Sequence, residues 1–418
     1  MERVAYVYAD MNGTPHLVGR LFAHVRRGRE SATFEYDDAW LANDERFALE
    51  PALQPGPGPF HTAGGRALFG AIGDSAPDRW GRTLMRRFER RRAVKACEAP
   101  RTLFEIDYLL SVNDETRQGA LRFADQPGGS FLAPPDQTPV PALIDLPRLL
   151  SAAERVIDES EGDEDLRLLF APGSSLGGAR PKASVREADG SLAIAKFPHK
   201  EDEWNTVLWE AVSLSLAKNA GIDVASWRSE RIAGKDVIIL SRFDRDDTNR
   251  IPFLSAMSMI GSKDNETRSY LEIADALRLH GAQPRKDLRE LYRRIVFTVL
   301  ISNVDDHMRN HGFLYFGTEG WVLSPAYDLN PMPVDVKPRV LSCAIDDEDQ
   351  TASLELALSV AEYFELKDAE ARRIAGDVGH AVSLWRREAA SLGITDAECN
   401  RMESAFAHAD LEAALLLV

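Results

Sequence analysis

The apolar residues between positions 288 and 300 recur at steps of three and four, which is the spacing of one face of an α-helix. They are Leu288, Leu291, Tyr292, Ile295, Val296, Val299 and Leu300. This pattern predicts a buried helix that ends just before Asn303. Further on, the apolar runs 312–316 and 321–323 flank Gly317-Thr318-Glu319-Gly320, which predicts a strand, a turn and a second strand. A helix and a hairpin are therefore expected on either side of the polar stretch between them.

Shorter apolar runs predict a β-rich module near the N-terminus. The expected strands are Val4–Tyr8, Leu17–Phe22 and Thr33–Tyr36, and Asn12-Gly13 is a typical turn between the first two. Residues 125–141 are too rich in proline and glycine for a regular element. We therefore expect the main internal boundary of the chain there.

The segment 192–197 alternates between two faces and places Lys196 on the same face as Leu192 and Ile194. We expect this lysine to point inward, where it needs a charged partner. Nucleotide phosphates, or Glu210 on a helix predicted next along the chain, would supply that partner. The alternative is a strand-edge lysine whose ammonium extends outward.

Three further elements complete the predicted order. The helix that carries Glu210 is expected over residues 204–218, and a buried strand is expected over residues 237–244. The last part of the chain, to Val418, is predicted to be helical, and Thr395-Asp396-Ala397-Glu398 is a capping box at the start of one of these helices. Strands followed by helices favour an α+β architecture.

Residues 79–92 combine seven arginines with Trp80, Leu84, Met85 and Phe88 at helical spacing. This pattern predicts a basic amphipathic helix. We favour a solvated helix that packs through its apolar side. The functional alternative is a contact with an acidic partner or with DNA.

Composition sets the outer limits. A chain of 418 residues, 44% hydrophobic and 28% charged, has enough apolar residues for a large core and two or three domains. The net charge of −16 argues against a protein covered in nucleic acid. No apolar run approaches the roughly 18 residues that cross a bilayer, and no signal-peptide region follows Met1. We therefore expect a cytoplasmic protein without a membrane partner.

Cys97, Cys343 and Cys399 are too scattered for a zinc site and should be reduced.

The polar stretch after the predicted helix, residues 303–310, contains Asp305 five residues before Asn310, and Asp328 follows the hairpin. In protein kinases an Asp and an Asn with this spacing supply the base and a magnesium ligand, and a later Asp supplies a second ligand. The carboxylate accepts the proton of a substrate hydroxyl, and hard oxygen donors hold Mg²⁺ against phosphates. Taken alone, such a pair also suits an ordinary solvated loop. A Gly-rich loop at residues 173–182, the inward lysine and a hinge-like strand precede it in kinase order, so we predict phosphoryl transfer from ATP.

Four motifs resemble the HipA-type serine/threonine kinases, which are toxins of bacterial toxin–antitoxin pairs. They are Ser175–Lys182, Leu240–Arg245, Asp305–Asn310 and Leu323–Leu329. Residues 34–41 and 77–81 look like the N-terminal module of the same family, so the resemblance covers nearly the whole chain. It implies an α+β, two-lobed protein-kinase-like fold with an N-terminal β-rich module and a mainly α-helical C-lobe. The implied domains are residues 1–140, 141–243 and 244–418.

The resemblance also implies roles for individual residues. Asp305 matches the catalytic base, Asn310 and Asp328 match the magnesium ligands, and Lys196 matches the lysine that contacts ATP phosphates. The other matches to nucleotide-binding positions are Gly177, Gly178, Ala179, Arg180 and Lys182 in the phosphate loop, Ser241, Arg242 and Phe243 in the hinge, and His307 and Tyr327 near the nucleotide. The sequence departs from the best-studied pattern at Ser241, where that pattern has an acid, and at Asp306, where it has glycine.

Ser175 matches the loop serine whose phosphorylation switches the family's kinases off. A phosphate there would add negative charge next to the glycines that approach ATP. The alternative is an unmodified serine that bonds the backbone of the turn.

The same resemblance implies a HipB-like helix-turn-helix antitoxin, operator DNA bound through that antitoxin, and a protein substrate such as an aminoacyl-tRNA synthetase. Two other classes of function stay open. A small-molecule phosphotransferase would modify a compound and leave its own loop unmodified. A degenerate kinase that serves as a DNA-binding co-repressor should lack a catalytic-site residue, and nothing obvious is missing here.

Overall fold

The structure, a computed structural model, describes residues 2–132, 140–170, 178–247 and 249–417. The chain divides into two compact units. The first contains Met1–Glu201 and Glu230–Leu254, and the second contains Asp202–Ser229 and Ser255–Val418. The division into three domains at residues 140 and 243 remains a prediction.

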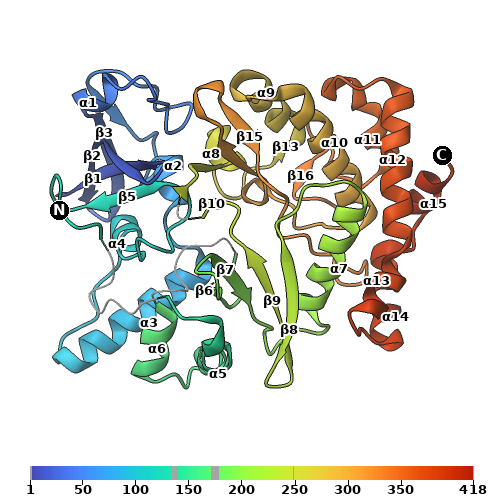
Figure 1. The fold of residues 1–418 in the computed structure, drawn as a ribbon, viewed down its shortest axis with the longest axis horizontal. Coiled ribbons are helices and arrows are strands. Elements are labelled where there is room, and N and C mark those ends of the chain that lie inside the picture. The colour runs from blue at the N-terminus through green and yellow to red at the C-terminus, as the bar shows by residue number, and fades with distance from the viewer. Residues whose placement is uncertain (1, 133–139, 171–177, 248, 418) are drawn as a thin grey trace. The chain divides into compact units, whose positions relative to one another are not determined.

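An antiparallel five-stranded sheet with the order β4-β3-β2-β1-β5 forms the N-terminal part of the first unit (Figure 1). Asn12 and Gly13 have φ angles of 52° and 78°, which a tight hairpin turn between β1 and β2 requires. The three predicted strands and this turn are confirmed. The strands are β1 (Glu2–Met11), β2 (Thr14–Arg26), β3 (Arg29–Tyr36), β4 (Pro59–His61) and β5 (Leu121–Ala124).

A second sheet in the first unit has the order β6-β7-β9-β8. These strands are β6 (Lys182–Arg186), β7 (Leu192–Lys196), β8 (Trp227–Ile232) and β9 (Lys235–Ser241), and three short strands follow, β10 (Arg245–Asp246), β11 (Asn249–Arg250) and β12 (Phe253–Ser255). The helices of this unit are α1 (Asp38–Leu41), α2 (Gly70–Asp74), α3 (Arg79–Ala96), α4 (Glu105–Leu110), α5 (Leu146–Ile157) and α6 (Asp163–Phe170), with a 3₁₀ turn η1 (Leu143–Asp145).

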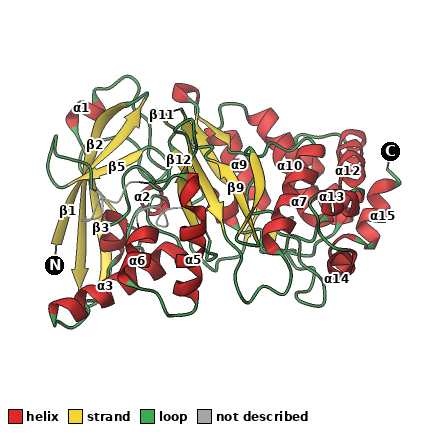
Figure 2. Ribbon diagram, turned by 60° about the horizontal axis from the view of Figure 1, so that its bottom comes forward, coloured by secondary structure: helices red, strands yellow, loops and turns green. Residues whose placement is uncertain are grey.

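Helices α3, α5 and α6 share one hydrophobic core with β6, β7 and β9, and Figure 2 shows the three helices close together. The sheet contributes its small and branched inward residues to this core, and α3 contributes Trp80 and Leu84. Burying such side chains stabilises the fold by roughly 1.5–3 kcal/mol each for the larger ones. The helix predicted over residues 79–92 is therefore confirmed, and it packs through its apolar side.

Most arginines of α3 form ion pairs within the first unit. Arg82 contacts Glu105 with two hydrogen bonds of 2.5 and 2.7 Å, and Arg87 contacts Glu161 at 2.9 Å. Arg92 binds Glu89 and Glu98. These contacts agree with the solvated, packed helix that we favoured. Four arginines of α3 nevertheless stay exposed, namely Arg79, Arg86, Arg90 and the ion-paired Arg92.

The second unit is mainly helical. Its helices are α7 (Thr206–Asn219), α8 (Ala256–Met259), α9 (Tyr270–His280), α10 (Pro284–Leu300), α11 (Leu354–Ser359), α12 (Asp368–Ser383), α13 (Trp385–Ser391), α14 (Asp396–Phe406) and α15 (Ala409–Leu415), with 3₁₀ turns η2 (Met308–Asn310), η3 (Gly317–Glu319) and η4 (Ala361–Phe364). Its strands are β13 (Arg268–Ser269), β14 (Gly312–Tyr315), β15 (Trp321–Leu323) and β16 (Cys343–Ala344). The predicted α+β class is thus confirmed. None of the helices in the described part of the chain has the length and apolar character needed to cross a bilayer.

Helix α10 is the buried support that the sequence predicted. All seven residues of the predicted face are buried, and the helix ends at Leu300. The hairpin β14–β15 is also confirmed, with Phe313 opposite Leu323. The carboxylate of Asp287 accepts a hydrogen bond of 3.2 Å from the backbone N–H of Leu323, which ties the hairpin to α10. These two elements hold the polar stretch between them at both ends.

Candidate active site

The stretch 303–310, called the acidic loop below, leaves α10 through a constrained turn. Ser302 has a φ of 53°, a left-handed conformation that residues other than glycine rarely adopt. The side chain of Asn303 is completely buried, and its backbone N–H donates to the carbonyl oxygen of Thr298 at 3.0 Å. The loop therefore has a fixed origin on the helix.

The two neighbouring carboxylates of the acidic loop lie in opposite environments. The Asp305 side chain is 65% exposed, and the ammonium of Lys337 is 3.9 Å from its Oδ1 atom. The Asp306 side chain is buried, and its Oδ2 atom accepts a hydrogen bond of 2.6 Å from the hydroxyl of Tyr270. Spacing alone favoured Asp305 as the base, and of the two carboxylates only Asp305 is exposed to solvent.

Asp306 has two further partners. Its Oδ2 atom lies 3.3 Å from Oγ1 of Thr298 and 3.1 Å from Nε2 of His311. Burial alone would raise the pKa of Asp306, but the charge and hydrogen bond of His311, with the Tyr270 hydroxyl, bring this pKa below its ordinary value. Asp306 is therefore a buried anion that anchors the acidic loop.

Two other predicted residues bond to the acidic loop, and one of them contacts Asp305. The Nδ2 atom of Asn310 donates to the backbone carbonyl of Asp305 at 3.2 Å. The hydroxyl of Tyr327 donates to the carbonyl oxygen of Arg309 at 2.6 Å. This bond joins the segment that carries Asp328 to the acidic loop, as the hairpin predicted.

Asp328 and His307 are the remaining predicted site residues of the second unit. Asp328 is half-buried and has a φ of 57°. Strain of this kind costs about 1–3 kcal/mol and persists where the surrounding structure imposes it, commonly at functional sites. His307 is exposed and precedes η2.

The oxygen donors present fit a magnesium ion. No group of three or more His, Cys, Asp and Glu side chains that is able to hold a metal occurs within residues 2–132, 140–170, 178–247 and 249–417. A Mg²⁺ ion held by Asn310, Asp328 and nucleotide phosphates does not need such a group, because Mg²⁺ in kinases combines one or two protein oxygens with phosphates and water.

The residues predicted to contact the nucleotide from strands lie in the first unit. Lys182 is buried, and its ammonium is 2.7 Å from Oδ2 of Asp78, the residue that caps the N-terminus of α3. The indole N–H of Trp80 donates to the carbonyl of Lys182 at 3.0 Å. Lys182 thus joins β6 to the segment 77–81, a partnership that the sequence did not predict.

Lys196 is opposite Lys182 in the β6–β7 pair. Alternation along β7 is confirmed, and Lys196 shares a face with Leu192 and Ile194 as expected, whereas the charged partner of this lysine stays a prediction. Ala193 and Ala195 face the core shared with α3, α5 and α6, whereas Leu192, Ile194 and Lys196 are half-buried on the other face. Small residues are required on the face that packs against helices, and Lys196 therefore takes the face away from that core.

The end of β9 carries the predicted hinge. Ser241 is exposed, and the backbone N–H of Arg242 donates to the carbonyl of Leu192 at 3.2 Å. The Arg242 side chain is buried and binds Asp244 with bonds of 2.6 and 2.5 Å. Phe243 packs near Phe253, with ring centroids 6.2 Å apart. The guanidinium of Arg242 therefore lies in the protein interior, bound to Asp244.

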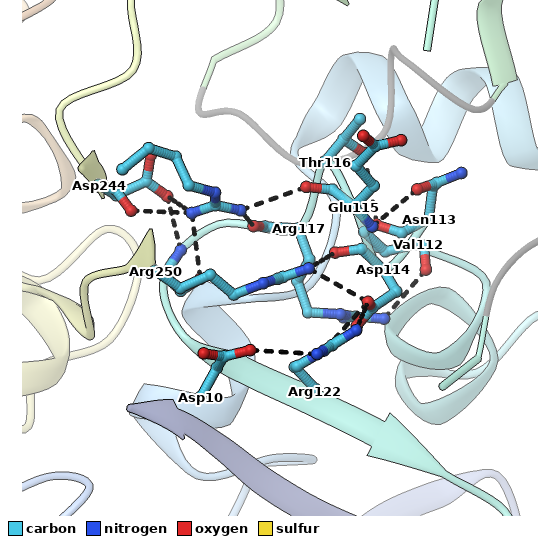
Figure 3. A network of polar contacts seen from close by, with 12 residues as sticks. Asp10, Val112, Asn113, Asp114, Glu115, Thr116, Arg117, Arg122, Asp244 and Arg250 are labelled. Carbon is cyan, nitrogen blue, oxygen red and sulfur yellow. Dashed lines mark hydrogen bonds and ion pairs between the residues drawn. The ribbon is translucent and has the colours of Figure 1, made fainter. Parts of the chain in front are cut away.

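The same region contains a buried ionic network that sequence reasoning missed (Figure 3). Asp244 also accepts from Arg245 at 2.9 Å and from the backbone N–H of Gly119 at 2.7 Å. Arg242 and Arg245 in turn donate to backbone carbonyls of residues 115–119. These bonds fix the exit of β9 to a loop that is more than a hundred residues earlier in the chain.

The network extends to the N-terminal sheet. Figure 3 shows Arg122 and Arg250 meeting at Asp114, with distances of 2.5 Å and 3.1 Å to Oδ2. Arg122 also contacts Asp10 of β1 at 3.1 Å. Arg117 is fully buried, and this burial lowers the pKa of its guanidinium to about 9.

Part of the predicted phosphate loop is outside the described residues, namely Ser175 and Gly177. Gly178, Ala179 and Arg180 are described and exposed, and Gly178 has a φ of 98°. A glycine is suited to this backbone conformation.

Comparisons with known proteins agree with these observations. The family model described as HipA-like C-terminal domain matches residues 174–385, about half of the chain. The protein named "Putative kinase Y4mE" of Sinorhizobium fredii is 27% identical over 351 residues, which cover 74% of this chain and 75% of that protein. A protein of Haemophilus influenzae named "Putative kinase" is 27% identical over 142 residues, which cover 30% of this chain and 41% of that protein.

A solved structure shows the same fold. One chain of the complex of HipA, HipB and operator DNA from Shewanella oneidensis superposes with a TM-score of 0.64 at 14% identity, over 98% of this chain and 96% of that chain. This likeness confirms the two-lobed, protein-kinase-like α+β fold predicted from the sequence.

Proposed function

This chain belongs to the family with the HipA-like C-terminal domain, and we propose that it is an ATP- and magnesium-dependent serine/threonine protein kinase. One observation supports this most. Of the two adjacent carboxylates on the acidic loop, Asp305 is exposed and lies next to Asn310, whereas Asp306 is buried and used for anchoring. A kinase needs an accessible base beside a magnesium ligand.

The proposed roles follow from these environments. Asp305 accepts the proton of a serine or threonine hydroxyl, and Asn310 and Asp328 hold the magnesium that binds the phosphates when nucleotide is present. His307 and Tyr327 border this centre. Bound Mg²⁺ neutralises charge on the phosphates and orients them.

In the first unit, Lys196 is the lysine proposed to contact ATP phosphates. Backbone groups of residues 241–243 are proposed to contact adenine, because the Arg242 guanidinium is engaged elsewhere. Lys182 is engaged with Asp78, so its proposed part in the phosphate loop is to hold the strand that follows the loop. The exposed residues 178–180, together with Gly177, are proposed to approach the phosphates.

The purified chain is expected to release ADP from ATP only when Mg²⁺ is present. Asp305→Asn should lower that rate by roughly 10²- to 10⁴-fold, as expected for loss of a general base, while ATP binding persists. The matched control is Asp347→Asn, because Asp347 is also an exposed carboxylate of the second unit. A wild-type chain that releases no ADP with Mg²⁺, or an Asp305→Asn variant with full activity, would contradict the proposed function.

The acceptor is proposed to be a protein, such as an aminoacyl-tRNA synthetase, so that the kinase acts as the toxin of a toxin–antitoxin pair. Phosphoproteomics shortly after induction of the wild-type and Asp305→Asn chains tests this proposal. New phosphoserine or phosphothreonine on a translation protein in the wild type alone is the expected result. Phosphorylation confined to a small compound would favour the phosphotransferase alternative.

The proposed partner is a HipB-like helix-turn-helix antitoxin that binds this chain together with operator DNA. The relative whose solved complex contains HipA, HipB and operator DNA supports this proposal. The exposed arginines 79, 86 and 90 of α3 form the candidate contact face. The double change Arg86→Glu and Arg90→Glu should weaken copurification or the shift of operator DNA. The matched double change Arg285→Glu and Arg387→Glu, at exposed arginines of the second unit, should not.

Autoregulation through Ser175 is proposed from the family resemblance. Incubation with Mg²⁺ and ATP followed by mass spectrometry should find phosphate at Ser175 in the wild type and not in Asp305→Asn or Ser175→Ala. The phosphorylated chain should bind ATP more weakly, because the added charge of about −1.5 to −2 repels phosphates. Modification that persists in Asp305→Asn would contradict this mechanism.

A further inference from the structure

The segment from Pro331 to Val340 follows Asp328 and is fixed to the second unit along its length. Its beginning bonds to the residue before the acidic loop, since the backbone N–H of Met332 donates to the carbonyl of Ser302 at 3.2 Å. Prolines at positions 331, 333 and 338 also restrict its backbone. The segment is therefore preorganised before any ligand binds.

Charged contacts hold the segment on both sides of Lys337. Asp335 pairs with Arg401 of α14 at 2.9 Å, and Arg339 pairs with Asp410 of α15 at 2.5 Å. Arg339 also donates to the carbonyl of Val299 at 3.0 Å, at the end of α10. Lys337 is thus carried by a turn whose neighbours are fixed to helices.

Lys337 itself directs its charge at the candidate base. Its backbone N–H donates to the carbonyl of Pro333 at 3.2 Å, and its ammonium is 3.9 Å from Oδ1 of Asp305. Both side chains are more than half exposed. An exposed pair of this kind adds only about 0–1 kcal/mol to stability, so stability does not account for a lysine at this position.

We propose that Lys337 is a second catalytic residue of the phosphoryl-transfer centre, whose ammonium contacts the oxygens of the transferring phosphoryl group beside Asp305. This inference rests on the proposed kinase function. A hydroxyl bound to Asp305 lies about 2.6–3.2 Å from the carboxylate, and the phosphorus that it attacks lies about 3–3.5 Å from the hydroxyl oxygen. The flexible, half-exposed side chain of Lys337 reaches that volume by rotation about its own bonds.

The transfer step balances without a further reactant. The hydroxyl oxygen of the acceptor forms a bond to the γ-phosphorus of ATP, and its proton passes to the carboxylate of Asp305. The bond from the γ-phosphorus to the bridging oxygen breaks, and its electron pair leaves with ADP. Negative charge is spread over the three equatorial oxygens of the phosphoryl group in the transition state. The Lys337 ammonium keeps its protons and donates hydrogen bonds to those oxygens.

The test compares Lys337→Met and Lys337→Arg with the wild type in the full chain. The readouts are ADP release from MgATP, the KM for ATP and the melting temperature. Lys337→Met should lower kcat by about 10²- to 10³-fold, as for loss of one donor to the charge of the transition state, with a KM within about twofold of the wild type. Lys337→Arg should recover at least about tenfold of the lost rate, because it restores a cation. Lys367→Met, at an exposed lysine of the same unit, should be unchanged.

Each other outcome overturns the inference in a distinct way. A Lys337→Met variant that keeps its rate shows that the ammonium takes no part in the reaction. A faster variant shows that Lys337 instead blocks Asp305. A loss of rate that follows a lowered melting temperature, without recovery in Lys337→Arg, shows a structural role. A wild-type chain without ADP release defeats the proposed function itself, whereas the first three outcomes leave that function standing.

Discussion

The exit of β9 and the acidic loop both place a dense group of charges at the end of a regular element, yet they use these charges differently. After β9, the side chains of Arg242, Asp244 and Arg245 are at most 7% exposed and bind one another and backbone carbonyls. After α10, exposed and buried charges alternate, with Asp305 accessible and Asp306 enclosed. A sequence motif alone therefore does not show which charged side chain is available to react. The burial of each side chain and the groups bonded to it distinguish the candidates.

The energetics of the two regions differ for the same reason. Burial raises the pKa of Asp244, but the charges of Arg242 and Arg245 outweigh it and keep this pKa well below the ordinary range. The carboxylate is therefore ionised in the fold and offsets part of the charge of two buried guanidinium groups. Such an arrangement is tolerated only while every member is present, because a single buried charge has no solvent to stabilise it.

The largest effect on stability is expected at Asp244. Asp244→Ala leaves Arg242 and Arg245 buried without their carboxylate, and breaking a buried pair in this way costs about 3–5 kcal/mol. Urea denaturation of the full chain measures the change in the free energy of unfolding. The control is Asp246→Ala, which removes an exposed carboxylate two residues later and should change stability by less than about 0.5 kcal/mol. If Asp244→Ala and Asp246→Ala lowered the free energy of unfolding equally, the difference drawn between the exit of β9 and the acidic loop would be wrong.

Much of the fold was predictable because it depends on local patterns. The steps of three and four in α10, the turn at Asn12-Gly13 and the cap at Thr395 all act within a few residues, and all are observed. The β9 network is different, since Arg122 and Asp10 are 112 positions apart. No periodicity connects such residues, so their contact could not be predicted from a local pattern. The packing of β7 is a related case, because its Ala193 and Ala195 face a core built with α3, α5 and α6, which no local pattern of the strand indicates.

The candidate site was predictable in part. Spacing predicted roles for Asp305, Asn310 and Asp328, which stay predictions, and hydrogen bonds link Asp305 to Asn310 and Tyr327 to the acidic loop. The contact of Lys337 with Asp305 joins residues that are distant in sequence, and it was not predicted from the sequence. The partner of Lys182, which is Asp78, was also out of reach, although residues 77–81 had been recognised as a motif. Ion pairs between residues that are far apart in sequence can be identified only once the folded structure is known.

A smaller effect is expected at Asp306, and it sharpens the contrast with its neighbour. Asp306→Asn keeps the shape of the side chain but removes the charge next to His311, which should destabilise the fold by about 1–3 kcal/mol. Asp305→Asn should leave stability unchanged and remove activity. Denaturation curves and ADP release for both variants give the comparison. If Asp306→Asn retained full stability and alone abolished ADP release, Asp306 would be the reacting group and Asp305 would not.

Glu50 is a third buried carboxylate, and its surroundings differ from those of Asp244 and Asp306. Its Oε2 atom accepts a hydrogen bond of 2.6 Å from the backbone N–H of Ala71, and the side chain is enclosed in the N-terminal part of the first unit. Burial raises the pKa of Glu50 to about 7, despite the opposing effect of that hydrogen bond. Asp244, with two guanidinium groups bound to it, has its pKa shifted in the other direction. The difference between these carboxylates is therefore the presence of directly bound cations.

The smallest predicted effect is a pH dependence caused by Glu50. Because its pKa is raised in the fold, the stabilising contribution is complete below the unfolded value near 4.5 and is lost as pH rises through about 7. A full proton of difference is worth about 1.4 kcal/mol per pH unit, so the wild type should lose about 1 kcal/mol from this group between pH 5 and pH 6. Glu50→Gln keeps the acceptor for Ala71 without a titrating proton, and its unfolding free energy should decline less over that interval. Glu45→Gln, at an exposed position, should follow the wild type, and identical pH profiles for all three chains would show that burial does not raise the pKa of Glu50.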